Sequence, residues 1–367
     1  MSQFTLKEIF AAFYPDKSIV STEVVEAGHI NDTYFVYTSD KFGYVLQRIN
    51  HIIFTDVSGL MHNMQKVTDH IIDIHNSKNI CTDNCVRVIT TTDDKAYFID
   101  TDGNYWRLNN LIADAHSYDK VECTTVALES GRIFGKFQNY LTEIDPNSLN
   151  ITIENFLDLD TRWLDFQNAV KNNDIGRLEN VQSLITEIQQ MLPNIVNLEN
   201  EAKVLNIPKR VTHNDTKINN VLFNKSNDDI TVIDLDTIMP GFIHFDYSDA
   251  IRTVTNTGEE YEKDQSSIDM NFELFKAFTT GFITPIYNNL TDGEKQTLPK
   301  STSLLAYLLC LRFMGDYING DKYFKVKYPE HNLDRAKTQL ALTKAILAKQ
   351  DDIDLFFDEL YKSCERT

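Results

Sequence analysis

Polar side chains that can bind a metal ion and accept a proton are concentrated between residues 213 and 236. Asp215 and Asn220 belong to one polar stretch, HNDTKINN. Asp234 and Asp236 lie at the end of an apolar run, VIDLD. Carboxylate and amide oxygens suit Mg²⁺, which takes one or two carboxylates and completes its shell with water and phosphate oxygens. Asp215 has a separate candidate role, as the carboxylate that orients an attacking hydroxyl and accepts its proton.

The joint spacing of these residues is more informative than any one of them. Asp and Asn alone commonly close turns by bonding backbone N–H groups. Here His213, Asp215, Lys217 and Asn220 stand at relative positions 0, +2, +4 and +7. This matches the protein-kinase template, in which the loop Asp is the base, the loop Asn and a strand Asp hold Mg²⁺, and a loop Lys meets the phosphoryl group. Since the template already has its base, we expect His213 to be a buried support of the loop.

A β-hairpin must position this set of residues. Two β-rich runs, 221–223 and 230–235, are joined by a polar turn. Their pairing would bring the polar side chains to one end of the hairpin. Beyond residue 113 the surrounding chain has long helical patterns, so we expect a mostly helical lobe. The patterns cover residues 123–144, 178–192, 272–287, 301–319 and 333–349.

The first 110 residues predict a smaller, strand-rich lobe. Three β-rich runs within residues 22–50, broken by Gly28 and by the turn at 39–43, indicate an antiparallel sheet. Residues 56–75 place apolar side chains at three- and four-residue steps, which is typical of one amphipathic helix. Runs at 96–99 and 105–108 flank an Asp-Gly turn, the strongest short hairpin signal. We therefore expect about five strands and one helix in this lobe.

The turn between the first two strands is the candidate contact for a nucleotide. Gly28 permits a tight turn, and the segment that includes His29 and Asn31 can bring backbone N–H groups to phosphate oxygens. The same residues also suit an ordinary hairpin turn. The prediction is a phosphate-contacting turn, with Gln47 on the third strand beside the nucleotide.

Gln47 stands where a protein kinase carries its phosphate-pairing Lys. The helix expected at 56–75 contains no Glu that could pair with such a lysine. Lys217 or Arg48 would then supply the missing charge. The alternative is a degenerate lobe in a protein that binds nucleotide without catalysis.

Charge and composition limit the partners of the chain. It has 367 residues, with 35 Lys and Arg against 54 Asp and Glu, for a net charge of −19. A surface this acidic repels nucleic acid and anionic membranes, so neither is expected as a partner. A bound triphosphate would need Mg²⁺ and a few placed cations. The five cysteines are scattered and lack zinc-site spacing, which favours reduced thiols.

No apolar stretch of the sequence reaches membrane-spanning length. The longest, residues 304–311, has 8 residues, against the roughly 20 that a spanning helix requires. The first residues, MSQFTLKEIF, carry charges and do not have the form of a signal peptide. We expect a cytoplasmic protein that is a monomer or a homodimer.

The chain resembles the superfamily of aminoglycoside phosphotransferases and choline kinases, and within it the bacterial N-acetylhexosamine 1-kinases. The similar stretches are AGHINDTYFV, YVLQRIN, VTHNDTKINNVLF, VIDLDTIMPG, FDYSDAIR and LRFMGDYINGDKYFKVKYPEHNLDRAKTQ, from residue 28 to residue 339. HNDTK together with IDLDT is specific to the superfamily. Gln47 in place of Lys and the last stretch point to the sugar-kinase branch.

The resemblance implies an α+β, protein-kinase-like fold of two lobes. Residues 1–110 would be the nucleotide-binding lobe and residues 111–367 the catalytic and substrate-binding lobe. The resemblance also implies that Asp215 is the catalytic base and that Asn220 and Asp234 bind Mg²⁺. It implies that Asp236 binds a second metal ion, and that Arg312 and Tyr323 contact the sugar.

Some of these residues also have simpler interpretations. Arg312 follows an apolar helical face, so its cation needs a partner, and Asp316 one turn later would provide one. Tyr323 could equally be a core aromatic residue. Asp246 and Asp249 are expected to brace the catalytic loop from behind.

The reaction implied by the resemblance is transfer of a phosphoryl group from Mg·ATP to the anomeric hydroxyl of GlcNAc or GalNAc, giving the 1-phosphate. Lys217 would help Mg²⁺ to neutralise the phosphate charge. A kinase for an amino alcohol or an aminoglycoside would share every catalytic residue. A non-catalytic nucleotide-binding protein is a second alternative. A metal-dependent hydrolase built on His213, Asp215, Asp234 and His244 is a third, less favoured because two-metal sites need more ligands.

Overall fold

The computed structural model describes residues 5–25, 30–223 and 231–366. These residues divide into two compact units, neither of them continuous in sequence. The first comprises Met1–Ser117, Tyr140–Glu154 and Asn220–Pro240, and the second Tyr118–Asn139, Asn155–Asn219 and Gly241–Thr367. A single division near residue 110 stays a prediction.

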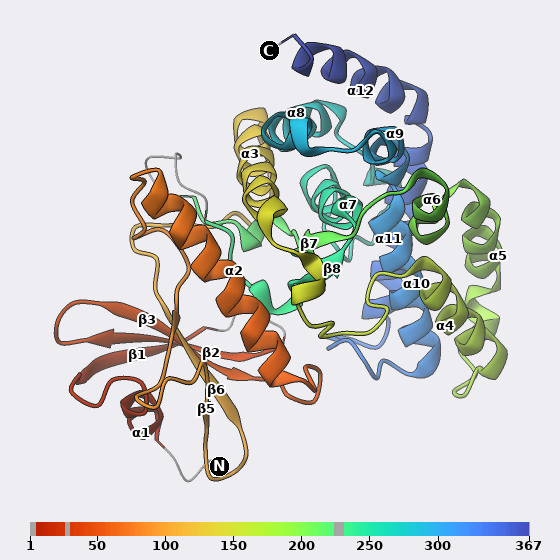
Figure 1. Ribbon diagram of the computed structural model, residues 1–367. Coiled ribbons are helices and arrows are strands. Elements are labelled where there is room, and N and C mark those ends of the chain that lie inside the picture. Colours follow the sequence, from red (N-terminus) through yellow and green to blue (C-terminus); the bar gives the residue numbers. More distant parts are fainter. Residues whose placement is uncertain (1–4, 26–29, 224–230, 367) are drawn as a thin grey trace. The chain divides into compact units, whose positions relative to one another are not determined.

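The first unit is built on an antiparallel sheet (Figure 1). Its strands follow the order β1-β2-β3-β6-β4, with β5 paired to β6. Its elements are α1 (Leu6–Ala11), β1 (Ile19–Val25), β2 (Asp32–Thr38), β3 (Gly43–Ile49), α2 (Val57–Ser77), β4 (Val88–Ile89), β5 (Phe98–Ile99) and β6 (Tyr105–Asn110). The predicted sheet and amphipathic helix are confirmed. The two-residue strand β4 has too few residues to show an alternating pattern.

One face of this sheet is apolar and packs against α1, and the other carries a polar row. On one face Val36, Leu46 and Leu108 are fully buried in an apolar cluster that includes Phe10 of α1. Successive side chains of a strand point to opposite faces. The other face therefore carries the row Thr33, Gln47 and Arg107, which are register partners across β2, β3 and β6. A polar row of this kind inside a sheet needs partners of its own.

The segment 220–240 is attached to the first unit by specific hydrogen bonds. His116 and Phe223 exchange backbone bonds of 3.0 and 2.8 Å. The Asn63 side chain of α2 donates to the Ile238 carbonyl at 2.9 Å. Within the segment, Val221 bridges Val232, but the expected hairpin strand does not continue, since Leu235–Thr237 form a 3-10 turn.

The second unit is mostly helical (Figure 1). Its elements are α3 (Thr124–Tyr140), α4 (Leu159–Asn172), α5 (Gln182–Met191), α6 (Leu198–Leu205), β7 (Arg210–Thr212), α7 (Ile243–Val254), α8 (Phe272–Ile286), α9 (Asp292–Ser301), α10 (Leu304–Asn319), α11 (His331–Leu347) and α12 (Gln350–Cys364). The strand β8 (Met239–Gly241) crosses the boundary between the units. Together with the sheet, these helices confirm the predicted α+β, kinase-like fold class.

Helix α10 lies in the centre of this unit, where it packs against α4, α7 and α11. Its residues Leu304, Leu308 and Leu311 are buried in the main apolar cluster. Helices α3 and α8 approach unusually closely, because a Cβ added at Gly131 would lie 2.1 Å from the Phe278 carbonyl oxygen. Across the described residues, no helix has both the length and the apolar character that a bilayer crossing demands.

Candidate active site

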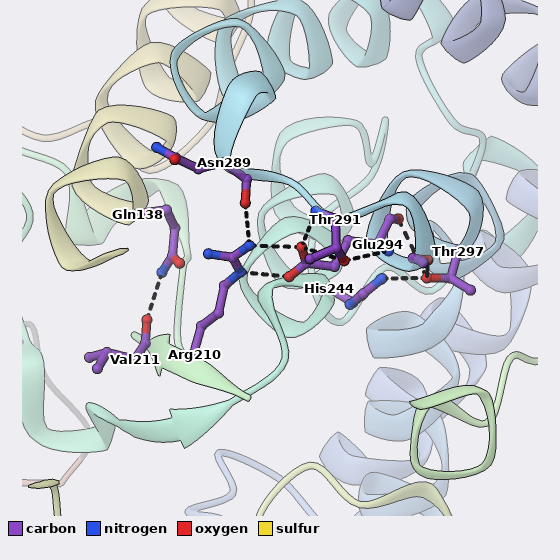
Figure 2. A network of polar contacts seen from close by, with 9 residues as sticks. Gln138, Arg210, Val211, His244, Asn289, Thr291, Glu294 and Thr297 are labelled. Carbon is purple, nitrogen blue, oxygen red and sulfur yellow. Dashed lines mark hydrogen bonds and ion pairs between the residues drawn. The ribbon is translucent and has the colours of Figure 1, made fainter. Parts of the chain in front are cut away.

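The loop that carries Asp215 begins directly after β7, and Arg210 anchors that strand. Its guanidinium binds Glu294 of α9 through two hydrogen bonds of 2.5 and 2.7 Å, and it also donates to the Asn289 carbonyl (Figure 2). Glu294 is fully buried and also caps α9 by accepting from the Thr291 backbone N–H. On the other side, the Gln138 amide donates to the Val211 carbonyl. The strand is thus fixed at each of its first two residues.

Asp246 of α7 holds the backbone of the loop. Its two carboxylate oxygens accept the N–H groups of Asn214 at 2.7 Å and His213 at 2.9 Å. Gln138 donates a third bond at 2.6 Å, and the Thr216 hydroxyl donates to the Asp246 carbonyl. Burial raises the pKa of Asp246 to about 6, while the backbone N–H donors of His213 and Asn214 oppose the rise. The expected bracing of the loop from behind is confirmed.

His213 supports the loop from within. It is fully buried between the rings of Phe134 and Phe137 of α3. Its Nδ1 accepts the backbone N–H of Asp215 at 3.3 Å, which leaves the ring proton on Nε2. This is the supporting role that the sequence predicts for His213.

The Asp215 carboxylate is half-buried and pairs with Lys217, whose Nζ lies 3.1 Å from Oδ2. Burial alone would raise the pKa of Asp215. The charge and hydrogen bond of Lys217 outweigh burial and lower the pKa, and the charge of Arg252 of α7 adds to this effect. The carboxylate is therefore ionised at neutral pH, the state that a general base requires.

Arg252 and Asp249 form a buried ion pair on α7, with two hydrogen bonds of 2.7 and 2.9 Å. Burial would lower the pKa of Arg252, but Asp249 raises it overall. A guanidinium fixed in this way is a permanent positive charge near Asp215. Among the described residues Asp249 bonds Arg252 and not the loop, so its predicted bracing of the loop stays a prediction.

Asn220 and Asp234, the predicted Mg²⁺ ligands, both belong to the first unit. The Ile233 N–H donates to the Asn220 carbonyl at 2.9 Å, which places Asn220 beside the residue that precedes Asp234. Asp234 is exposed and has a left-handed backbone with φ 60°. This conformation is costly outside glycine and occurs preferentially at functional sites. Across the described residues, no three His, Cys, Asp or Glu side chains gather closely enough to hold a metal by themselves. An amide and a carboxylate oxygen fit Mg²⁺ whose shell is completed by phosphate and water.

Two of the four predicted nucleotide contacts, Asn31 and Gln47, form internal hydrogen bonds. Gly28 and His29 lie outside the described residues. Asn31 donates to Asp236 Oδ2 at 2.6 Å, and Gln47 donates to the Thr33 hydroxyl at 3.0 Å. Asp236, the predicted second-metal ligand, is buried and also pairs with Arg107.

The cation nearest to Gln47 is one that the sequence analysis missed. Arg48 points to the opposite face and pairs with exposed Asp32, whereas Arg107 of β6 donates to the Gln47 side-chain oxygen at 2.9 Å. Arg107 is 1% exposed. The available signal was an arginine inside an otherwise buried strand, YWRLNN.

Arg312 and Tyr323, the predicted sugar contacts, meet in the second unit. The Arg312 guanidinium carbon lies 5.1 to 5.4 Å from the ring centres of Phe156, Tyr323 and Phe324. Burial lowers the pKa of Arg312. Tyr323 is 56% exposed, so its interpretation as a core residue is wrong.

The pairing of Arg312 with Asp316 is also wrong. Asp316 instead accepts the backbone N–H groups of Lys322, Tyr323 and Phe324, and the amide of Asn332. Among the described residues no carboxylate lies within salt-bridge distance of Arg312. The aromatic rings therefore hold a guanidinium that forms no ion pair with any described carboxylate.

The fold and this loop define a phosphotransferase. Residues 21–267, more than half of the chain, match the phosphotransferase enzyme family, and the chain belongs to it. Phosphoryl transfer is therefore its class of chemistry.

Solved structures with the same fold are distant in sequence. An aminoglycoside phosphotransferase from Alicyclobacillus acidocaldarius is 11% identical, with a TM-score of 0.61 over 100% of this chain and 98% of that one. A spectinomycin phosphotransferase in complex with ADP and spectinomycin is 13% identical, with a TM-score of 0.60 over 94% and 97%. An ethanolamine kinase from Plasmodium vivax is 14% identical, with a TM-score of 0.55 over 87% and 82%.

Proposed function

We propose that this protein phosphorylates the anomeric hydroxyl of a free N-acetylhexosamine, GlcNAc or GalNAc, with Mg·ATP as donor. The observation that carries the proposal of transfer is the ionised, half-buried Asp215 beside Lys217, on a loop of the phosphotransferase family. A nucleotide donor is supported by the ADP in the spectinomycin phosphotransferase structure.

The proposed reaction needs proton transfer, positioning of the hydroxyl and stabilisation of phosphate charge. Asp215 orients the sugar hydroxyl and takes its proton while the O1–P bond forms and the bond from the γ-phosphorus to the bridging oxygen breaks, releasing ADP. Lys217 stabilises the charge on the transferring group. Asn220 and Asp234 would hold Mg²⁺, which, when bound, neutralises phosphate oxygens. Only five positions separate Asp215 from Asn220 in sequence.

The surroundings of Arg312 support a sugar over a cationic acceptor. A guanidinium without a carboxylate partner repels ammonium groups and donates hydrogen bonds to hydroxyl or carbonyl oxygens. The related solved structures include enzymes for ethanolamine and aminoglycosides, which carry amines. Arg312 therefore favours a neutral, oxygen-rich acceptor in this chain.

The test is an acceptor panel with Mg·ATP. Free GlcNAc, GalNAc, glucose, ethanolamine, choline and an aminoglycoside are assayed for ADP release, and sugar products are assayed for loss of the reducing end. The matched control is the methyl glycoside of GlcNAc, whose anomeric oxygen is blocked. We expect turnover with the free N-acetyl sugars and none with the glycoside. Transfer to the amine-bearing acceptors alone would refute the sugar assignment, and no transfer at all would favour a nucleotide-binding protein.

A further inference from the structure

A buried arginine on β6 carries hydrogen-bond donors that none of the described residues uses. Arg107 donates from Nε to the Gln47 oxygen at 2.9 Å, and from Nη1 to Asp236 and, at 3.6 Å, to the Met64 sulfur. Its second terminal nitrogen, Nη2, donates to none of the described residues. A guanidinium has five N–H donors, so two of them remain for a ligand.

The neighbours of Arg107 fix the plane of its guanidinium. Gln47 gives its amide N–H to Thr33 at 3.0 Å, so its oxygen must face Arg107. Asp236 is 4% exposed and uses both oxygens, one for Arg107 and one for Asn31. All these residues belong to the first unit.

The position of this charge is informative. In protein kinases a lysine of the third strand pairs with the phosphates. Here Gln47 occupies that strand, and its direct register partner on the next strand is Arg107. The positive charge that a protein kinase carries on the third strand therefore lies here on the neighbouring strand β6, on the same face of the sheet. An arginine also presents a planar donor pair that matches phosphate oxygens better than an ammonium group does.

We propose that Arg107 binds the nucleotide phosphates through Nη2, and that Gln47 and Asp236 position its guanidinium. Asp236 is then the counter-ion of Arg107 and not a ligand of a second metal. The inference rests on the proposed function only in taking a nucleotide as the ligand. It is independent of the acceptor.

The first test measures nucleotide binding by calorimetry on the full chain, without acceptor. We expect Arg107→Met to weaken binding of Mg·ATP by about tenfold to a hundredfold, the effect of one charge-assisted contact, and to leave adenosine binding unchanged. Arg107→Lys should lose less. Arg87→Met, an exposed arginine of the same unit, is the matched control and should bind as the wild type does.

The second test covers the case in which Arg107→Met does not fold, because Asp236 is left buried without its partner. The double variant Arg107→Met, Asp236→Asn removes both charges and should show the same selective loss of Mg·ATP affinity. Wild-type affinity in a folded double variant would overturn the proposal, and so would a loss seen only in Arg48→Met.

Asp236→Asn alone separates the counter-ion from the metal ligand. As counter-ion, its loss should leave the Mg²⁺ concentration needed for ATP binding unchanged. A severalfold increase in that concentration would show that Asp236 binds metal. Failure to phosphorylate a sugar would affect only the proposed function, whereas a wild-type protein that binds no nucleotide would overturn both.

Discussion

Lys217 Nζ lies 3.1 Å from Asp215 Oδ2, and this pairing keeps the pKa of Asp215 below its ordinary value despite burial. A base must be ionised before it can accept a proton, so the pair prepares Asp215 for its proposed role. Asp215 and Lys217 follow directly after a stretch of backbone that is held in place, because Asp246 accepts the N–H groups of His213 and Asn214.

Replacing the base should stop turnover without disturbing nucleotide binding. Asp215→Asn keeps the shape of the side chain but cannot accept the proton, so we expect kcat to fall by about a thousandfold. The dissociation constant for Mg·ATP should stay within about twofold, since no reacting proton is involved in binding. Asp174→Asn, on an exposed turn, is the control. Turnover close to that of the wild type would remove Asp215 from the mechanism.

Removing the lysine should move the pH dependence of the reaction. Lys217 lowers the pKa of Asp215, so Lys217→Met raises it. The acid limb of the kcat/KM profile should therefore shift to higher pH, because a nearby positive charge that favours the ionised carboxylate is gone. Lys217→Arg keeps the charge and should leave the limb in place. An unshifted limb in Lys217→Met would separate the lysine from the titration of Asp215.

Truncating Arg312 should affect the acceptor and spare the donor. Its guanidinium lies against Tyr323 and has no carboxylate partner among the described residues. We expect Arg312→Met to raise the KM for the sugar about tenfold or more, the cost of a charged hydrogen bond, with the KM for ATP unchanged. Arg132→Met on α3, where the arginine pairs with Glu129, is the control. An equal rise in both KM values would contradict an acceptor role.

The elements that could be predicted are those whose burial leaves a pattern. Helix α2 shows one apolar face, and the side chains of strand β3 alternate in burial over most of its length. Helix α7 escaped prediction because almost every residue is buried, so apolar and charged residues mix without a period. Helix α4 is too polar to show a clear stripe, and α9 has a proline inside it.

The candidate site divides along the same line. Asp215, Lys217 and Asn220 could be chosen from spacing alone, because their roles depend on local sequence. Arg107 could not, since its value comes from Asp236, 129 positions away, and from a strand register that periodicity does not reveal. The wrong pairing of Arg312 with Asp316 has the same origin. A local partner was available, but the loop after α10 competes for that carboxylate.

Acid should destabilise the fold through His244. This residue is fully buried, and Nε2 meets the Thr297 hydroxyl at 2.7 Å (Figure 2). The hydroxyl donates to the Gly293 carbonyl, so Nε2 of His244 must donate to the hydroxyl. Burial lowers the pKa of His244 to about 4. Because the unfolded chain then binds the proton more readily, the stability from this group is complete above about pH 6.5 and is lost as pH falls toward 4.

The measurement compares unfolding free energies at pH 7 and pH 5. Between pH 7 and pH 5 the unfolding free energy of the wild type should fall by about 2 kcal/mol more than that of His244→Gln, because glutamine does not titrate. Asp246, whose pKa burial raises to about 6, contributes with the opposite sign in both proteins and cancels in the comparison. Thr297→Val keeps the histidine and should keep the acid sensitivity. Equal losses in the wild type and His244→Gln would refute the assignment.

The close approach of α3 and α8 should make their glycines irreplaceable. A Cβ at Gly131 would lie 2.1 Å from the Phe278 carbonyl oxygen, and one at Gly281 would lie 2.1 Å from the Leu128 carbonyl oxygen. Both obstacles are backbone atoms, so the helices must move apart. We expect Gly131→Ala to lower the free energy of unfolding by about 2 kcal/mol or more, as overpacking does. Since α3 also carries Gln138, Phe134 and Phe137 behind the catalytic loop, turnover should fall as well.

A matched control lies on α10. At Gly315 an added Cβ would meet its nearest atoms at 3.9 and 4.0 Å, which is ordinary contact. Gly315→Ala should therefore leave stability unchanged or raise it by about 0.5 to 1 kcal/mol, because alanine has a higher helix propensity than glycine. Chemical denaturation of the two variants measures the difference directly. Equal stabilities would show that α3 and α8 can separate without cost, and would leave the glycines of this contact unexplained by packing.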